Sequence, residues 1–349
     1  MFPSSNGGMI VMKQFTGYMH GVNLGGWFSQ CDHTEDRYDH FITEEDFKEF
    51  STWNLDHVRV PVDYNLVETN DGVYIEKGFE RLAECIRLCR KYGLNMILDL
   101  HKTYGFSFDK GERENGFFED EALQERFYRL WEQFAERFAK DKDMLAFELL
   151  NEVTDQSLSL IWNEIAEKCI IRIRAIDKDV KILVGSYWNN AVHAVKDLRK
   201  PHDENVIYNF HCYEPIMFTH QGAYWIDNMP HDYRCGFGGT IQENIDRTVA
   251  LLPDNAHVFE LCEDKTQQIG ADFFIKVFKE AVDKAEAEGT TLYCGEYGVI
   301  EHADREETIK WYKAIHEALD YYGIGRAAWS YKKMDFSLNE RNMKVVFGA

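Results

Sequence analysis

The sequence predicts a (β/α)8 barrel, in which eight parallel strands form a closed ring inside a layer of helices. Short apolar runs alternate with helical patterns along the chain, and its 349 residues suit one large α/β domain. The alternative is an open doubly wound sheet, which calls for a Gly-rich phosphate loop after an early strand. Asn23-Leu-Gly-Gly-Trp27 lacks the G-x-G-x-x-G spacing, so we expect the barrel.

Eight apolar runs predict the strands. Each is rich in Val, Ile, Leu and aromatic residues and is bounded by polar residues or Gly. The predicted strands cover residues 18–24, 57–62, 95–101, 144–151, 181–187, 206–213, 291–298 and 326–332.

Six segments with a helical period lie between these runs. Thr43-Glu-Glu-Asp46 is close to a capping box, and Gly93 and Gly289 stand where a helix would stop before a strand. Few residues follow Lys332, so we expect the last helix of the barrel to be truncated. The predicted helices cover residues 43–53, 76–92, 120–140, 157–176, 271–288 and 304–322.

No linker rich in Pro, Gly or Ser divides the chain, which has only 6 Pro. We therefore expect a single catalytic domain over residues 1–349, with residues 1–15 as an N-terminal extension. Long segments, 102–119 and 214–239, follow the third and sixth predicted strands. Such loops belong to the C-terminal face of a barrel, where active sites are built.

The net charge of −21 argues against nucleic acid and anionic membranes as partners, because both require basic patches. No apolar stretch is long enough to span a membrane, and the first residues do not have the pattern of a secretory signal. The 8 cysteines contain no Cys-x-x-Cys, which indicates free thiols and no zinc site. We expect a cytoplasmic monomer, or a secreted protein if a signal has been removed.

Two glutamates, Glu152 and Glu296, each end an apolar run. A carboxylate at the exit of a buried strand is costly unless it lines a cavity or takes part in chemistry. Two of them suggest the acid and the nucleophile of a retaining glycosidase, whose carboxyl groups lie roughly 5–5.5 Å apart. The alternative is that each glutamate is a solvated residue at a strand end.

Strand alternation predicts which side chains lie beneath this pair. If Glu152 faces the barrel axis, so does Glu148, and by the same rule Asp99 accompanies His101. Arg59 would then meet these carboxylates, and buried charges persist mainly when they are paired. The alternative is that bulges break the alternation and turn Glu148 or Asp99 toward the helices.

Aromatic side chains gather at strand exits. His211 and Tyr213 share one face of the sixth predicted strand, and Trp329 and Tyr331 share one face of the eighth. Rings there can stack on sugars while hydroxyl and imidazole groups bond sugar oxygens; barrel packing is the alternative. Further rings follow other strands: Trp27, Phe106, Phe108, Trp188, Phe218, Tyr224 and Trp225.

Together these motifs resemble glycoside hydrolase family 5, which contains cellulases, other β-glucanases and mannanases. The resemblance extends from Gly21 to Trp329, with six motifs in order at barrel spacing. They are His57-Val-Arg-Val-Pro61, Leu98-Asp-Leu-His101, Leu150-Asn-Glu152, Phe210-His-Cys-Tyr213, Gly295-Glu296 and Ala328-Trp329.

The resemblance implies that Glu152 is the acid/base and Glu296 the nucleophile, and that Asn151 bonds the sugar 2-hydroxyl. Val153 stands where the family usually has Pro, a departure that we expect to alter the loop and not the chemistry. The resemblance also implies that Arg59 and Tyr213 steady the nucleophile, that His101 and His211 line the −1 site, that Trp329 is its stacking platform, and that Trp27 lies in a segment similar to exo-acting β-1,3-glucanases.

We therefore expect a retaining, cellulase-like hydrolase of β-1,4-glucan or cello-oligosaccharides that needs no metal or cofactor. β-Glucosidase, exo-β-1,3-glucanase and mannanase activities are alternatives on the same fold, and a non-catalytic sugar-binding barrel is a further one. The rings of loop 214–239 predict a shortened cleft that favours oligosaccharides. Alternatively, they anchor the loop to the barrel.

Overall fold

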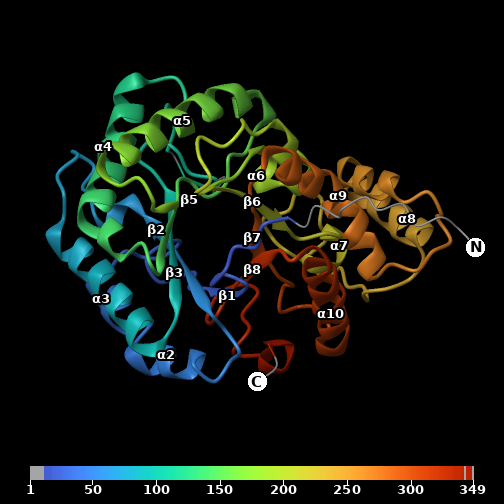
Figure 1. Ribbon diagram of the computed structural model, residues 1–349. Coiled ribbons are helices and arrows are strands. Elements are labelled where there is room, and N and C mark those ends of the chain that lie inside the picture. The colour runs from blue at the N-terminus through green and yellow to red at the C-terminus, as the bar shows by residue number, and fades with distance from the viewer. Residues whose placement is uncertain (1–11, 110, 113, 342, 348–349) are drawn as a thin grey trace, which may run out of the picture.

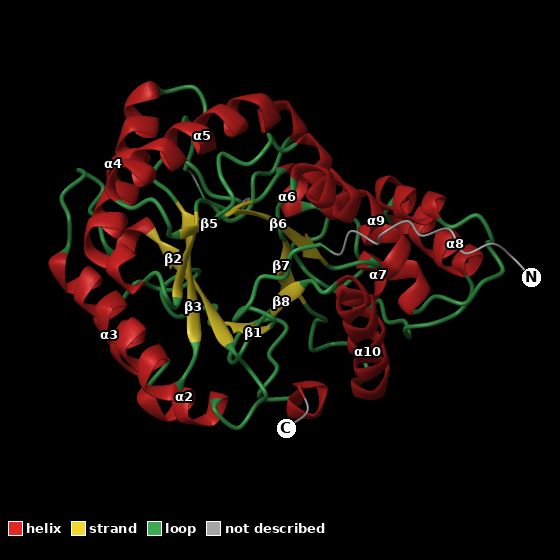
Figure 2. Ribbon diagram, in the orientation of Figure 1, coloured by secondary structure: helices red, strands yellow, loops and turns green. Residues whose placement is uncertain are grey.

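The predicted (β/α)8 barrel is confirmed. The structure, a computed structural model, describes residues 12–109, 111–112, 114–341 and 343–347. Eight parallel strands form a closed barrel in chain order, with β1 paired to both β2 and β8. Figures 1 and 2 show the helices as an outer layer around it. The strands are β1 (His20–Asn23), β2 (His57–Asp63), β3 (Asn95–Lys102), β4 (Leu145–Glu148), β5 (Lys181–Val184), β6 (Val206–Cys212), β7 (Leu292–Tyr297) and β8 (Gly325–Ala328).

All six predicted helices are present. The backbone N–H of Thr43 donates to Asp46 at 2.7 Å, which completes the capping box. Gly93 and Gly289 end their helices with φ of 70° each, as Gly allows. The predicted helices are α2 (Glu44–Phe50), α3 (Glu76–Tyr92), α4 (Glu121–Phe138), α5 (Ser159–Ile176), α9 (Ala271–Glu288) and α10 (Arg305–Tyr322), and the additional ones are α1 (Glu35–His40), α6 (Tyr187–Asn190), α7 (Ile216–Thr219) and α8 (Ile241–Leu251).

The barrel wall is completed differently after β8. Up to residue 347, the described chain contains no α-helix there, only the 3₁₀-helix η6 (Met343–Phe347). Figure 1 shows this short helix between α2 and α10. The ring of Phe347 stacks on Trp53, with 5.6 Å between centroids. A short segment therefore covers the core where the truncated helix was expected.

Apolar side chains fill the N-terminal end of the barrel. Phe15 stacks on Tyr18, and its ring meets Tyr293 edge-on at 5.6 Å. Phe15 is therefore part of the barrel core. Residues 1–11 of the predicted N-terminal extension lie outside the described residues, and the bounds of that extension stay a prediction. This core layer consists of Phe15, Tyr18, Ile97, Ala146, Leu183, Ile207, Tyr293 and Ala327.

The opposite, C-terminal end of the barrel carries irregular pairing. The register between β6 and β7 shifts after Phe210, so that His211 pairs with Glu296. A second shift separates Cys294 from Tyr297 in the pairing of β7 with β8. Such bulges re-aim side chains locally.

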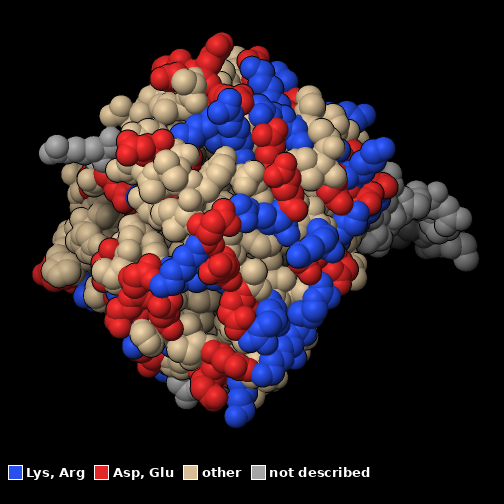
Figure 3. Space-filling view, turned by 90° about the vertical axis from the view of Figure 1, so that its left-hand side faces the viewer, with Lys and Arg blue, Asp and Glu red and all other residues tan. Residues whose placement is uncertain are grey.

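The outer surface mixes charges of both signs. Figure 3 shows Lys and Arg interspersed with Asp and Glu on the side of the molecule that carries α3 and α4. Arg81 of α3, for example, pairs with Glu35 at 2.8 Å and with Asp39 at 2.7 Å. All eight cysteines are free thiols, as predicted, whereas the compartment stays a prediction. Among the described residues, every helix is too short or too polar to span a membrane.

Candidate active site

The two glutamates meet at the C-terminal end of the barrel. Glu296 lies in β7, and Glu152 lies just beyond β4, where the backbone N–H of Asn151 still donates to the Leu100 carbonyl at 3.1 Å. One carboxyl oxygen of Glu152, one of Glu296 and one ring nitrogen of His211 all lie within 4.8 Å of one another. This spacing matches a retaining pair of carboxyl groups.

The two carboxyl groups have different electrostatic surroundings. Burial raises the pKa of Glu152 to about 7, against the opposing hydrogen bond from Asn189. Glu296 instead accepts hydrogen bonds from Arg59 Nη1 at 2.7 Å and from the Tyr213 hydroxyl at 2.9 Å. Glu152 can therefore hold a proton near neutral pH, while Glu296 is paired with the guanidinium of Arg59.

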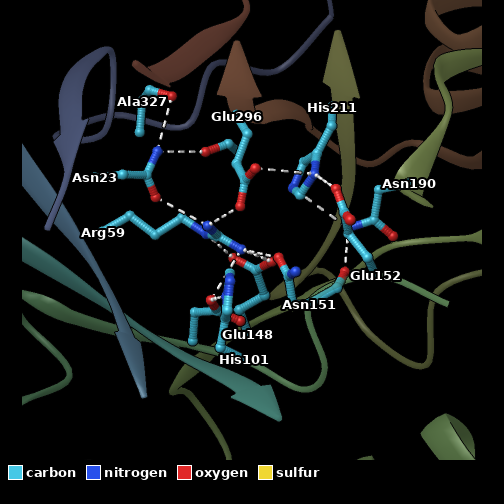
Figure 4. Close-up of polar contacts among 12 residues, drawn as sticks. Asn23, Arg59, His101, Glu148, Asn151, Glu152, Asn190, His211, Glu296 and Ala327 are labelled. Carbon is cyan, nitrogen blue, oxygen red and sulfur yellow. Dashed lines mark hydrogen bonds and ion pairs between the residues drawn. The ribbon is translucent and has the colours of Figure 1, made fainter. Parts of the chain in front are cut away.

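Arg59 forms the floor beneath the pair, as strand alternation predicts. Its Nε and Nη2 donate to the two oxygens of Glu148 at 2.7 and 2.8 Å, and Nη2 lies 3.0 Å from Asp99. The guanidinium also donates to Asn151 Oδ1, beside Glu152, and to Asn23 Oδ1 in β1 (Figure 4). Its side chain is fully buried. The predicted ionic network is confirmed.

Two histidines border the glutamates, and their pKa values are shifted in opposite directions. Burial lowers the pKa of His211 to about 3, so its ring is neutral, and its Nδ1 lies 2.7 Å from Glu152 and 3.6 Å from Glu296. Burial also acts to lower the pKa of His101, but the carboxylate of Asp99 at 2.6 Å outweighs it and the pKa is raised. The Asp99 carboxylate thus holds His101 and favours its protonated form.

Buried polar atoms without a partner mark where a ligand would bind. Among the described residues these include Nε2 of His101 and Nδ2 of Asn151. A buried polar atom without a hydrogen-bond partner is costly, and such exceptions gather where a ligand supplies the missing bond. Sugar hydroxyls can supply it, because they both donate and accept. Of the described His, Cys, Asp and Glu side chains, only Glu152, His211 and Glu296 could hold a metal together, and they are the same site.

Comparison with known proteins identifies the family. The sequence model of the cellulase family (glycosyl hydrolase family 5) matches residues 14–335. The chain belongs to glycosyl hydrolase family 5. It is 47% identical over 315 residues to cellodextrinase A of Ruminococcus flavefaciens, spanning 90% of this chain and 86% of that protein. It is 36% identical over 330 residues to endoglucanase C of Acetivibrio thermocellus, spanning 93% of this chain and 94% of that protein.

Solved structures agree on the fold. Cel5A of Thermotoga maritima, in complex with cellobiose, superposes with a TM-score of 0.73 at 23% identity, over 95% of this chain and 97% of that chain. The cellulose synthase subunit Z of Clostridioides difficile gives a TM-score of 0.75 at 23% identity, over 95% of this chain and 99% of that chain. This protein is thus a family 5 glycoside hydrolase with the barrel of that family.

In this family 5 hydrolase, Trp329 lies parallel to His101, with 3° between the rings and 5.6 Å between centroids. A Cβ on Gly25 would come 2.8 Å from its ring, so glycine there makes room for Trp329. Tyr331 does not share its face, contrary to the prediction: its hydroxyl bonds Asp46 at 3.0 Å on the α2 side. The cause is that β8 ends at Ala328, before the strand alternation reaches Tyr331.

Trp27 is used in packing. Its ring stacks on Phe28 at 3.8 Å, its Nε1 donates to the Tyr38 carbonyl at 2.9 Å, and 5% of it is exposed. None of the contacts found among the described residues joins Trp27 to Glu152 or Glu296. Substrate binding by Trp27 stays a prediction.

Sequence reasoning missed four asparagines. Asn23 donates to the carbonyls of Gly295 and Ala327, and Asn209 donates to Glu148 at 2.8 Å (Figure 4 labels Asn23, Glu148 and Ala327). A lone Asn inside an otherwise apolar strand was the available signal, because a buried amide needs partners. The other two, Asn189 and Asn190, follow β5, and Asn189 donates to Glu152 at 2.7 Å. Only the Trp-Asn-Asn run after a predicted strand marked them.

Proposed function

We propose that this glycoside hydrolase cleaves β-1,4-linked gluco-oligosaccharides with retention of the anomeric configuration. One observation carries the proposal: two buried carboxyl groups with oxygens within 4.8 Å, of which Glu152 has a pKa raised to about 7 and Glu296 is paired with Arg59. The linkage is supported by the similarity to cellodextrinase A and endoglucanase C.

In the first step, an oxygen of Glu296 attacks the anomeric carbon and the glycosidic C–O bond breaks. Glu152 gives its proton to the departing oxygen, which leaves as a free sugar hydroxyl. In the second step, Glu152 takes a proton from water, and the water oxygen attacks the anomeric carbon. The bond to Glu296 breaks, and the sugar leaves with its original β configuration.

The −1 sugar would be held by groups already aligned beside the pair. Nδ2 of Asn151 and Nε2 of His101 would bond its hydroxyls, and the Trp329 ring would face its C–H surface. Arg59 and Tyr213 hold the Glu296 carboxyl in place for attack. Positioning of this kind lowers the entropic part of the barrier.

The loop after β6 supports action on short chains. Trp225 packs in an apolar cluster with Trp329 and Phe336, beside the proposed −1 sugar. Phe218, in contrast, is buried in the main core and anchors the loop to the barrel, as the alternative interpretation of these rings expects. Tyr224 is 81% exposed. A cleft bordered by this loop favours oligosaccharides over crystalline polymer.

Reducing-end release from cello-, laminari- and manno-oligosaccharides of equal length tests the substrate class. We expect the highest kcat/KM on the β-1,4-glucose series and loss of activity in Glu152→Gln and Glu296→Gln. Glu121→Gln, at an exposed glutamate of α4, is the matched control and should keep wild-type rates. A higher kcat/KM on the laminari or manno series would overturn the proposed linkage or sugar.

A further inference from the structure

The segment α6, after β5, is a left-handed turn. Trp188, Asn189 and Asn190 have φ of 49°, 55° and 57°. L-residues avoid this conformation, and Asn tolerates it better than most. Three such residues in a row persist only where surrounding contacts fix them, and strain of this kind concentrates at functional sites.

Three hydrogen bonds tie this turn to the segment that carries Glu152. The backbone N–H of Asn189 donates to the Val153 carbonyl at 3.0 Å, and its side-chain Nδ2 donates to Glu152 Oε2 at 2.7 Å. Asn190 Nδ2 donates to the Asn151 carbonyl. A Cβ on Gly185 would lie 2.2 Å from the Asn190 side chain, so glycine there leaves room for it.

The bond to the Asn151 carbonyl decides which way the Asn190 amide points. A carbonyl accepts only from the NH2 group, and the same NH2 group lies 3.4 Å from Nε2 of His211. Nε2 must then accept, so the neutral ring of His211 carries its hydrogen on Nδ1. That N–H points at Glu152 Oε1, 2.7 Å away (Figure 4 shows Asn190, His211 and Glu152).

We propose that Asn189 and Asn190 are positioning residues for the acid/base. Asn189 holds one oxygen of Glu152 directly, and Asn190 holds the other through the tautomer of His211. The inference rests on the proposed acid/base role of Glu152 and adds what orients that carboxyl and tunes its proton affinity. Without the two donors, the carboxyl could rotate away from the glycosidic oxygen.

The Asn189 hydrogen bond shifts the pKa of Glu152 in a definite direction. A donor to a carboxylate favours its ionised form, so Asn189 opposes burial, which raises the pKa of Glu152. Loss of this donor should raise that pKa further. Variants at Asn189 leave in place the other titratable or charged groups that act on Glu152: His211, Glu296, Tyr213, His101, Arg59 and Asp99.

Two glycine variants of the same turn isolate the side-chain effect. Asn189→Gly keeps the left-handed backbone and removes the donor, and Trp188→Gly relieves the same turn beside it with the donor intact. Asn189→Asp is a second variant of native shape, with a carboxylate where the donor was. The pKa of Glu152 is followed by 13C NMR of glutamate-labelled protein, with Glu152→Gln for assignment, beside the pH profile of kcat/KM.

We expect the Glu152 titration to move up by about one pH unit in Asn189→Gly, further in Asn189→Asp, and not at all in Trp188→Gly. The basic limb of kcat/KM should move with it, and kcat should fall roughly tenfold through looser positioning. An unchanged titration in both Asn189 variants would overturn the inference. A shifted titration with an unmoved basic limb would support the Asn189 contact and instead refute Glu152 as the acid.

The role of Asn190, which acts through the tautomer of His211, is tested by a separate measurement. In 15N NMR of histidine-labelled protein, wild type and Asn189→Gly should show His211 with its hydrogen on Nδ1. Asn190→Gly should show a mixture of both His211 tautomers, while the rest of its spectrum stays native. An unchanged His211 tautomer in folded Asn190→Gly would overturn the role of Asn190.

Discussion

Arg59 determines how the two glutamates differ. Its guanidinium contacts three carboxylates, those of Asp99, Glu148 and Glu296, in a fully buried position. Glu152 accepts no hydrogen bond from it and is paired with neutral donors instead. One strand residue therefore places a cation against the proposed nucleophile, whereas burial, which Asn189 and Arg59 oppose, favours the protonated form of the proposed acid.

Removal of Arg59 should strongly destabilise the fold. In Arg59→Met, Asp99 and Glu148 lose their cation while still buried, which costs about 3–5 kcal/mol for a buried pair. Arg81→Met removes a pairing with the largely exposed Glu35 and Asp39 and should cost under about 1 kcal/mol. Urea unfolding at neutral pH compares the two. Equal losses would contradict the network assignment.

Glu296→Ala should abolish hydrolysis of activated aryl cellobiosides, because no carboxylate remains to attack the anomeric carbon. Added azide should restore turnover and yield a glycosyl azide of inverted configuration. Proton NMR of the product checks this, with Glu121→Gln unaffected by azide. A rescued product of retained configuration would contradict the nucleophile role of Glu296.

The pKa of Glu152 predicts the basic limb of activity. The carboxyl group is a proton donor only below its pKa of about 7, so kcat/KM should fall as pH rises through that value. In Glu152→Gln, aryl substrates with good leaving groups need no proton, and their kcat/KM should lose this limb. Poor leaving groups should lose far more rate. Equal losses for both classes would argue against an acid role.

At the scale of elements, strand ends and glycines determine where the ring of Trp329, the proposed stacking platform, lies. β8 stops at Ala328, and the chain then passes close to β7, where a Cβ on Gly298 would lie 2.4 Å from the Trp329 carbonyl. Gly25, after β1, leaves room for the Trp329 ring. Glycines after β1 and β7 thus leave room for the ring that lies beside His101.

Trp329→Ala should lower kcat/KM sharply while the melting temperature falls little. The matched variant Trp53→Ala empties a fully buried site under η6 and should cost about 3–5 kcal/mol of stability. Calorimetry and kinetics on both variants separate the effects. If Trp329→Ala lost as much stability as Trp53→Ala with only modest kinetic loss, packing would be its main role.

At the scale of the whole molecule, one end of the barrel is closed and the other carries the site. Phe15 and Tyr18 fill the N-terminal end, while the glutamates and the long loops lie at the C-terminal end. Trp225, in the loop after β6, packs in the same cluster as Trp329. We therefore expect this loop to limit how far a glucan chain can extend past that ring.

This geometry predicts a short cleft. On soluble cello-oligosaccharides, kcat/KM should stop rising at roughly three or four glucose units, since longer chains would reach past the loop. Deletion of the exposed ring in Tyr224→Ala is the control and should leave that limit unchanged, because Tyr224 projects into solvent. A kcat/KM that still climbs at about six units would indicate an open groove.

Local sequence pattern determined the strands, six of the helices and the side of the strand on which Arg59, Asp99 and Glu148 lie. These features depend on period and alternation within one segment, which a sequence displays directly. The glutamates were predictable for a related reason, because a charged residue at the end of an apolar run is visible without any neighbour.

Only the tertiary structure decided which distant segments share a contact. The tie between Asn189 and Glu152 and the contact of Tyr331 with Asp46, away from Trp329, both depend on backbone turns. Their local preferences are weak or unfavourable, as in the left-handed run that carries Asn189. Such turns are held by partners far away in sequence, so the pattern of the chain alone could not reveal them.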